Sequence, residues 1–194
     1  MSELLPYTLL NEQLITQFRA KFTCLYCGKQ NILKDFTKPF KVIPLLSPPV
    51  DSRAVSAGLL LTKFLNKKFQ AKCPAPCHGD NEARYHAVKG KFTFIGINRR
   101  GFYDTDGNVI PKLATRVTDT ASGKWGDTYL GELVSVISHR GSINSGHFIT
   151  YSKVTDGGGS WYLNDDCKRI KQTTHPLKNN KKGETAELLI FKNF

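Results

Sequence analysis

The sequence predicts an α+β fold made mostly of strands, with one or two helices. Two observations lead to this prediction: helical spacing of apolar residues is confined to the first third of the chain, and short or alternating apolar runs fill the rest. The chain has 194 residues, of which 40% are hydrophobic and 11% aromatic. These residues suffice for one buried core, so we expect a single domain over residues 1–194.

Two segments near the start of the chain predict helices. Residues 6–18 place apolar side chains at helical spacing, although a helix that begins after a proline there should be short. Ser52 can cap a second helix, whose apolar positions recur every three or four residues between Val55 and Leu65. The polar run at residues 66–68 should end this helix.

From Phe69 onward the pattern is typical of strands joined by turns, with period-two or short apolar runs separated by Gly, Asp and Asn. We expect turns at Asp106-Gly107 and at residues 157–159. The candidate strands are residues 91–98, 108–110, 130–138, 147–153, 160–163 and 187–191.

The sequence shows neither a membrane span nor a secretory signal, and this bears on where the protein is located. The longest apolar runs, such as residues 59–61 and 133–137, are far shorter than the roughly 18 residues of a membrane span. The first twenty residues are interrupted by polar side chains and lack the apolar stretch of a secretory signal. We therefore expect an intracellular protein, nuclear or cytoplasmic, without a membrane partner.

The formal net charge of +12 is large for this length. It is compatible with a nucleic-acid partner, an acidic protein surface or a solubilising face. Nucleic-acid binding would use the basic residues within 168–182 together with Arg99, Arg100, Phe102 and Tyr103. However, residues 168–182 resemble a solvated loop, and aromatic residues on strands more often belong to the core, so this interpretation is not favoured.

Four of the five cysteines form two close pairs. Cys24 and Cys27 make a C-x2-C, and Cys73 and Cys77 make a C-x3-C. In a chain without a secretory signal such pairs indicate metal ligands rather than disulfides, and four thiolates can enclose a structural, tetrahedral zinc ion. The 45 residues between the pairs leave open that these are ordinary reduced cysteines, and His78 can replace one ligand.

Residues 139–148 read HRGSINSGHF and predict a strand end, a Gly-rich loop and a histidine, His147, at the start of the next strand. The loop suits an extended chain as ligand. A turn then returns WYLNDD antiparallel to this strand, so that His147 and Asp165 become cross-strand neighbours. A carboxylate that orients an imidazole is the arrangement of a general base, but such a pair on a hairpin is by itself more often incidental.

The flanking sequence resembles a known family. HRGSINSGHFITYSK followed by WYLNDD is similar to the histidine box of ubiquitin-specific proteases. KFTFIGINRRGF resembles a palm strand of that family, AELLIF its closing strand, and the cysteine pairs its finger zinc ligands. The resemblance runs from about Phe22 to Phe191. It implies part of a papain-like fold, with zinc-binding fingers at about 20–90 and an antiparallel palm at about 91–194.

The resemblance also implies roles for individual residues. His147 would be the general base, Asp165 would orient it, and Asp166 would lie beside the oxyanion region; Asn164 competes with Asp165 if the strand is offset by one residue. Ubiquitin or a ubiquitin-like protein would be the partner. The loop over its tail would be formed by His139, Gly141, Ser142, Asn144 and Gly146.

The resemblance implies a catalytic cysteine in a thumb that precedes the fingers, and this sequence starts at the fingers. Cys167, the one cysteine outside the pairs, follows Asp165 too closely to attack a substrate beside His147. We therefore expect no hydrolysis by this chain alone, whether it is part of a longer enzyme or a second chain supplies the thumb. The alternative is a non-catalytic pseudo-protease that serves as a scaffold in a protein or ribonucleoprotein complex.

Overall fold

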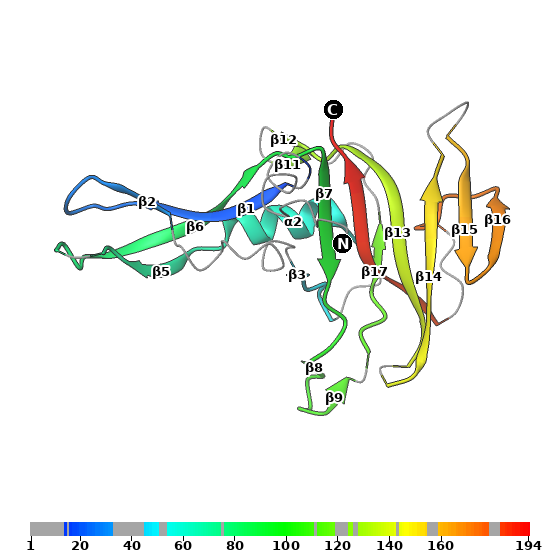
Figure 1. Cartoon of the computed structure of the whole chain (residues 1–194). Helices are drawn as coiled ribbons and strands as arrows, with labels where there is room; N and C mark the ends of the chain where they lie inside the picture. Colours follow the sequence, from blue (N-terminus) through cyan, green and yellow to red (C-terminus); the bar gives the residue numbers. More distant parts are fainter. Residues whose placement is uncertain are drawn as a thin grey trace, which may run out of the picture.

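The computed structural model describes residues 14, 16–32, 45–50, 54–74, 76–110, 112–118, 124–125, 128–142, 144–154, 159–178 and 183–194. These residues form a long arm, which we call the fingers, and a broad sheet, which we call the palm, with a helix between them (Figure 1). The α+β prediction is confirmed. Among the described helices, none has the length and apolar character needed to cross a membrane.

The fingers are a four-stranded antiparallel sheet in the order β2-β1-β6-β5. Its strands are β1 (Gln17–Thr23), β2 (Gln30–Ile32), β5 (Phe69–Lys72) and β6 (Asp80–Val88). Apolar residues alternate along β1, and Phe18, Ala20 and Phe22 are buried on one face. The helix predicted at 6–18 lies largely outside the described residues, and its last two positions are wrong because they start β1 instead.

Helix α2 (Ala57–Asn66) lies between the two sheets, close to its predicted position. Its cap is Ser56 rather than Ser52, which lies outside the described residues: the Ser56 hydroxyl accepts a hydrogen bond from Leu59 N–H at 3.1 Å. Leu60 and Leu61 are buried, and Phe64 stacks on Tyr85 of β6 at 4.4 Å between ring centroids. The helix thus packs against the base of the fingers.

The palm is a seven-stranded sheet in the order β16-β15-β14-β13-β17-β7-β3. The pairs are antiparallel except β3 with β7. Its strands are β3 (Leu45–Leu46), β7 (Phe92–Ile97), β13 (Glu132–Gly141), β14 (Gly146–Lys153), β15 (Trp161–Asp165), β16 (Lys168–Gln172) and β17 (Glu184–Lys192). Five of the six strands predicted from the sequence are here, and their ends lie within three residues of the predicted ones. β16 was not predicted because its residues are mostly exposed and polar.

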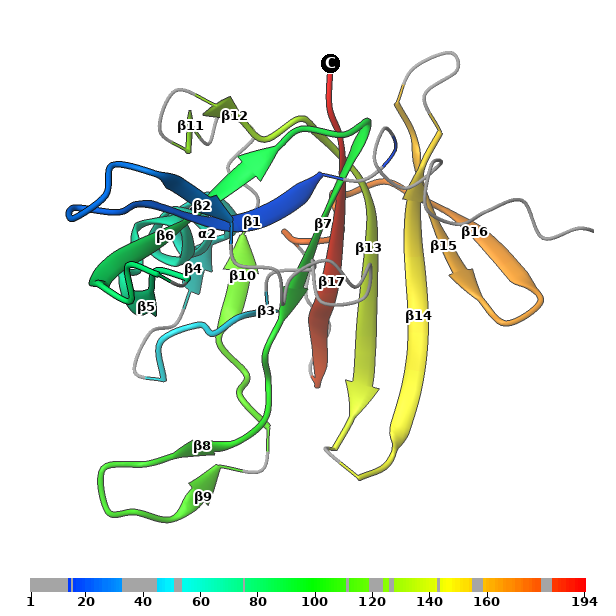
Figure 2. The same cartoon turned by 60° about the vertical axis from the view of Figure 1, so that its left-hand side comes forward.

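Three two-stranded ribbons complete the described fold. β4 (Ala54–Ser56) pairs in parallel with β10 (Arg116–Thr118). The other two ribbons are antiparallel: β11 (Lys124–Trp125) pairs with β12 (Thr128–Tyr129), and β8 (Phe102–Tyr103) pairs with β9 (Val109–Ile110). The β8–β9 hairpin turns at the predicted Asp106-Gly107 step, where Gly107 has φ +83°. It projects from the same end of the molecule as the loop between β13 and β14 (Figures 1 and 2).

The main core lies where the central palm strands meet α2 and the base of the fingers. Ile95, Val136, Ile149 and Leu189, one from each of four palm strands, are at most 1% exposed. This core fixes the register of β13, β14 and β17, because a slip of one residue would turn every apolar side chain away from it. The ends of these strands carry the histidine site.

Candidate functional site

The two cysteine pairs lie in tight turns at the ends of the two finger hairpins. In the first turn Cys24 N–H donates to Lys29 O, and Gly28 N–H donates to Cys24 O, both at 2.9 Å. Gly28 closes this turn with φ +68°, a conformation that favours glycine. In the second turn Cys73 N–H donates to Gly79 O at 2.9 Å. Because β1 pairs with β6, the two turns lie side by side.

The four thiols gather in one cluster. The Sγ atoms of Cys24, Cys27, Cys73 and Cys77 all lie within 4.8 Å of one another. The distance between sulfurs is 3.5 Å for Cys24 and Cys77 and 3.8 Å for Cys27 and Cys73. A tetrahedral zinc site with Zn–S bonds of about 2.3 Å has sulfurs about 3.8 Å apart, so these four residues fit such a site. The antiparallel pairing of β1 with β6 brings the two cysteine pairs together, although 45 residues separate them in the sequence.

Asn81 connects the two turns, a role that sequence reasoning missed. This residue is 3% exposed; its Oδ1 accepts from Leu25 N–H at 2.9 Å, and its Nδ2 donates to Gly79 O at 2.6 Å. Nδ2 also lies 3.7 Å from Cys24 Sγ. In the sequence, this role is indicated only by the position of Asn81 just after a cysteine turn. His78, the alternative ligand, is exposed and is not part of the cluster.

The environments of the Cys24 and Cys73 thiols differ. A hydrogen bond from the backbone N–H of Cys27 lowers the pKa of Cys24 to about 6. Burial raises the pKa of Cys73 to about 12. Cys24 is thus ready to ligate as a thiolate at neutral pH, whereas a cation must displace the proton of Cys73.

His147 and Asp165 meet at one end of the palm. β14 and β15 pair Thr150 with Asn164, and this register places Asp165 diagonally across from His147 on one face of the sheet. His147 Nε2 lies 2.5 Å from Asp165 Oδ1. Since a carboxylate accepts, Nε2 carries the proton and Nδ1 is the ring nitrogen left to accept one. The hydrogen bond from His147 holds the pKa of Asp165 below its usual range.

The neighbours of Asp165 have other contacts. Asn164 Nδ2 donates to Thr150 O at 3.2 Å and to Ser152 Oγ at 2.9 Å, so the structure brings Asp165 rather than Asn164 to His147. Asp166 has φ +50° in the turn after β15, and its Oδ2 lies 3.9 Å from His147 Nε2. Cys167 is exposed in the same turn.

The loop between β13 and β14 depends on two glycines. Gly141 has φ +125°, and a Cβ there would lie 2.6 Å from Ser145 O. A Cβ on Gly146 would lie 2.3 Å from His139 Nε2. Between them, Ser142 Oγ accepts from Ser145 N–H at 3.2 Å and closes a small turn. Of the predicted loop residues, Gly141, Ser142, Asn144 and Gly146 are exposed beside His147.

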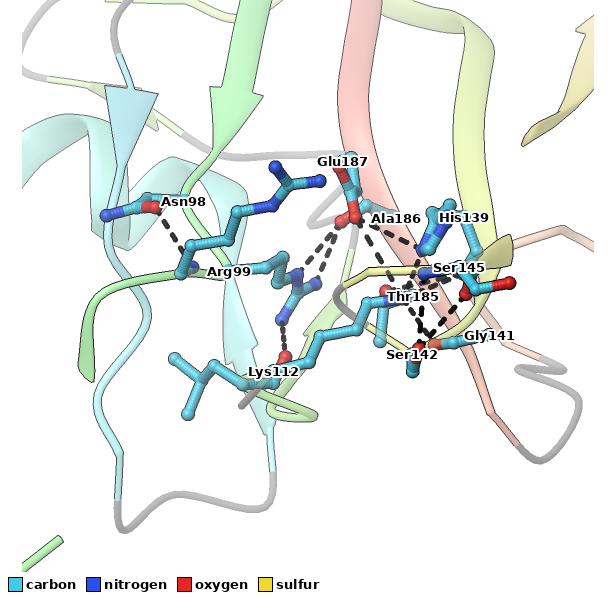
Figure 3. A network of polar contacts seen from close by, with 12 residues as sticks. Asn98, Arg99, Lys112, His139, Gly141, Ser142, Ser145, Thr185, Ala186 and Glu187 are labelled. Carbon is cyan, nitrogen blue, oxygen red and sulfur yellow. Dashed lines mark hydrogen bonds and ion pairs between the residues drawn. The ribbon is translucent and has the colours of Figure 1, made fainter. Parts of the chain in front are cut away.

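His139 supports this loop from below. It is 4% exposed, and its ring lies 4.7 Å from that of Phe148. Lys112 Nζ lies 2.7 Å from His139 Nδ1 and donates to His139 O and Gly141 O at 3.2 Å (Figure 3). An ammonium has no acceptor, so Nδ1 accepts and the imidazole is neutral. Burial, followed by the charge of Lys112, lowers the pKa of His139.

Arg99 corrects one interpretation of the sequence. Its side chain is 2% exposed, and its guanidinium donates to the carbonyl oxygens of Leu113 and Thr115. It also donates to the carbonyl oxygen of Ala186 (Figure 3). A guanidinium enclosed in this way pairs with carbonyls and does not reach a phosphate, so Arg99 is not part of a nucleic-acid surface. Arg100 is exposed. Sequence reasoning missed the part that Arg99, Lys112 and Glu187 take in the site. Their contacts join strands and loops that are distant in the sequence, and no local motif reveals such contacts.

The finger and palm arrangement is that of the ubiquitin-specific protease fold. Residues 61–191, more than half of the chain, match the family model described as ubiquitin carboxyl-terminal hydrolase. The chain therefore belongs to this family. A comparison with curated protein sequences finds no match.

Solved structures with a similar fold include the SAGA Ubp8/Sgf11/Sus1/Sgf73 DUB module bound to ubiquitin aldehyde, at a TM-score of 0.61 and 18% identity. The SAGA DUB module bound to monoubiquitin and the yeast module with a substituted Sgf73 are also similar, each at 0.61 and 19%. In all three, the match covers 93% of this chain and 41% of the other. This chain thus spans about two fifths of those proteins, and at such identity the likeness establishes the fold.

Proposed function

We propose that this chain supplies the fingers and palm of a ubiquitin-specific protease-type deubiquitinase that works in the nucleus or cytoplasm. The single observation that carries the proposal is the hydrogen bond between His147 Nε2 and Asp165 Oδ1, beside an exposed Gly-rich loop. Family membership and the structures with ubiquitin or ubiquitin aldehyde support it. The reaction is thiol-dependent hydrolysis of the bond after the C-terminal glycine of ubiquitin.

In this proposal each group has one step. His147 Nδ1 takes the proton of a cysteine thiol that a segment outside this sequence provides, while Asp165 holds the ring through Nε2. The thiolate attacks the carbonyl carbon, the C–N bond breaks, and the imidazolium returns its proton to the leaving amine. Water, activated by the same imidazole, then hydrolyses the thioester. Asp166, whose Oδ2 lies 3.9 Å from His147 Nε2, would border the oxyanion region.

The loop has the properties needed to hold the ubiquitin tail. Gly141 and Gly146 carry no side chain, so an extended backbone can approach closely. Ser142 and Asn144 are exposed beside them as polar groups. His139 is buried, so it fixes the loop from beneath and does not itself touch the tail.

The cysteine cluster holds a structural zinc ion in this proposal. Four thiolates complete a tetrahedron and leave no position for water or substrate, so the ion supplies stability and no chemistry. It joins the two finger hairpins at their ends. Protein-bound metal by mass spectrometry under native conditions would give one zinc per chain, and Cys73→Ser would give none.

Ubiquitin binding tests the function directly. We expect the chain to bind ubiquitin in titration calorimetry, and ubiquitin without its C-terminal glycines to bind about tenfold more weakly, since the loop then loses its ligand. A fluorogenic substrate on the ubiquitin C-terminus should show no turnover. Any turnover that disappears in Cys167→Ser would assign the nucleophile to Cys167 and contradict the mechanism above.

A second candidate function is a pseudo-protease scaffold in a protein or ribonucleoprotein complex. The net charge of +12 favours it, because a basic surface suits an acidic partner better than the basic face of ubiquitin. The same calorimetry separates the two: absence of ubiquitin binding would support the scaffold and overturn the deubiquitinase. A gel shift that weakens steeply with salt would identify nucleic acid as the acidic partner.

A further inference from the structure

Charged side chains flank His147 in a row across the palm. Strand register places Arg140 of β13 opposite His147 of β14 and, on its other side, opposite Glu184 of β17. Asp165 of β15 continues the row. The order across four neighbouring strands is therefore carboxylate, guanidinium, imidazole, carboxylate.

The guanidinium of Arg140 lies between the two carboxylates. Its Nη2 donates to Glu184 Oε2 at 3.2 Å, and its Nη1 lies 3.8 Å from Asp165 Oδ2. His147 uses the other oxygen of Asp165, Oδ1. Because the two oxygens have different partners, the carboxylate cannot rotate without losing one of them.

Arg140 is itself anchored from the side away from His147. The Glu184 side chain is 2% exposed. Burial, followed by the nearby Glu184, raises the pKa of the buried Tyr151. Arg140 Nε, however, is buried with no hydrogen-bond partner among the residues that the structure describes. A buried, unsatisfied donor costs stability, so this cluster is not arranged for stability alone.

We propose that Arg140 is a positioning residue: held by Glu184, it fixes the Asp165 carboxylate so that Oδ1 accepts the Nε2 proton of His147. Its importance for catalysis rests on the proposed function. The arrangement itself does not, because it is a property of this chain without substrate or nucleophile.

Lys168 provides a matched control. It pairs with Asp165 across β15 and β16 and also lowers the pKa of that carboxyl, but it is exposed on the edge strand β16, with three strands between it and Glu184 of β17. Lys168→Met removes the same charge as Arg140→Met and leaves the anchored guanidinium in place. The two variants therefore separate positioning from charge.

The readout is the ratio of the two neutral tautomers of His147, measured from its ring nitrogen shifts in the labelled chain above the titration range. We expect Arg140→Met to lower the ratio of Nε2–H to Nδ1–H about fivefold, the upper end of the effect of a partly exposed ion pair. Lys168→Met should change it less than twofold. Arg140→Lys should recover only part of the ratio, because an ammonium lacks the fork that spans two carboxylates.

An unchanged ratio in Arg140→Met, or an equal drop in Lys168→Met, would overturn the proposal. If Arg140→Met does not fold, Glu184→Gln releases the anchor while keeping its volume. That variant should lower the ratio about threefold, because the guanidinium remains near Asp165 but loses its anchor, and no change there would also overturn the proposal. Ubiquitin binding by the same samples tests the proposed function separately, since neither result requires the other.

Discussion

The fingers and the palm are both antiparallel sheets, but they are held together differently. The second hydrophobic cluster, in the fingers, has five buried members, Phe22, Cys24, Ala71, Cys73 and Ala83, and two of these are cysteines of the thiol cluster. The main cluster includes residues of palm strands β3, β7, β13, β14, β15 and β17 together with α2. The fingers are thus a narrow ribbon with little core, and the palm is a buried sheet.

This difference indicates that the two regions obtain their stability from different sources. A four-stranded ribbon with a small core is only marginally stable unless something else closes it, and four clustered thiolates at the end of the ribbon provide a place for a metal ion to do so. The palm buries enough apolar surface to fold by the hydrophobic effect. Metal should therefore control the order of the fingers and leave the palm intact.

The largest expected effect is the removal of one ligand. Cys73→Ser should abolish metal binding and unfold the ends of the fingers, because the free energy of binding structural zinc, on the order of 10 kcal/mol, is coupled to folding there. Hydrogen exchange should show lost protection in β2 and β5 and retained protection in β13 and β17. Cys167→Ser, at an exposed thiol outside the cluster, is the control and should match wild type. Equal loss of protection in the palm would refute the division into two regions.

A core substitution should produce the opposite pattern. Leu189 is fully buried at the centre of the palm, so Leu189→Ala should lower the free energy of unfolding by about 2 to 5 kcal/mol. Denaturant unfolding measures this loss, and Ile170→Ala, at a half-exposed position on β16, should cost within about 0.5 kcal/mol. Zinc affinity should stay unchanged in both variants. A large fall in zinc affinity with Leu189→Ala would mean that the regions fold as one.

The sequence predicted the palm better than the fingers, for a physical reason. Palm strands such as β14 and β17 place apolar side chains in the buried core, so their apolar patterns are clear. At the start of β1, the apolar spacing that ends at Phe18 fits a helix, but pairing with β6 outweighs this local preference from Gln17 onward. The structure of the fingers depends on pairing between strands that are distant in the sequence, and a local pattern of residues does not reveal that pairing.

The residues of the candidate site likewise fall into some that the sequence predicts and some that it does not. Thiols and the His147–Asp165 pair could be predicted because their residue types and spacing are unusual. Arg140 and Lys112 could not, because their roles come from register and from a loop that returns to the end of β13. A basic residue within a strand or loop looks like an ordinary solvated charge until its partners across the sheet are known.

Mild acid should weaken the palm through His139. Burial lowers its pKa below the ordinary value of 6.5, so the unfolded chain takes up a proton first as the pH falls. Stability should therefore drop as the pH falls below 6.5, until the folded form also protonates, with a slope of at most about 1.4 kcal/mol per pH unit. Unfolding curves of His139→Gln should lack this component, whereas those of His78→Gln, at an exposed finger residue, should keep it. Identical pH dependence in wild type and His139→Gln would contradict this account.

The smallest effect concerns the helix that both regions share. Ser56 caps α2, and Ser56→Ala should lower the free energy of unfolding by about 1 kcal/mol, because Leu59 N–H loses its acceptor. Ser56→Gly should cost only a few tenths of that, since glycine is tolerated at a helix cap. Leu60 and Leu61 belong to the main core, so the loss should appear in palm unfolding and leave zinc affinity unchanged. A fall in zinc affinity would contradict this expectation. It would mean that the stabilities of the palm and the fingers are coupled through α2, where Phe64 stacks on Tyr85 of β6.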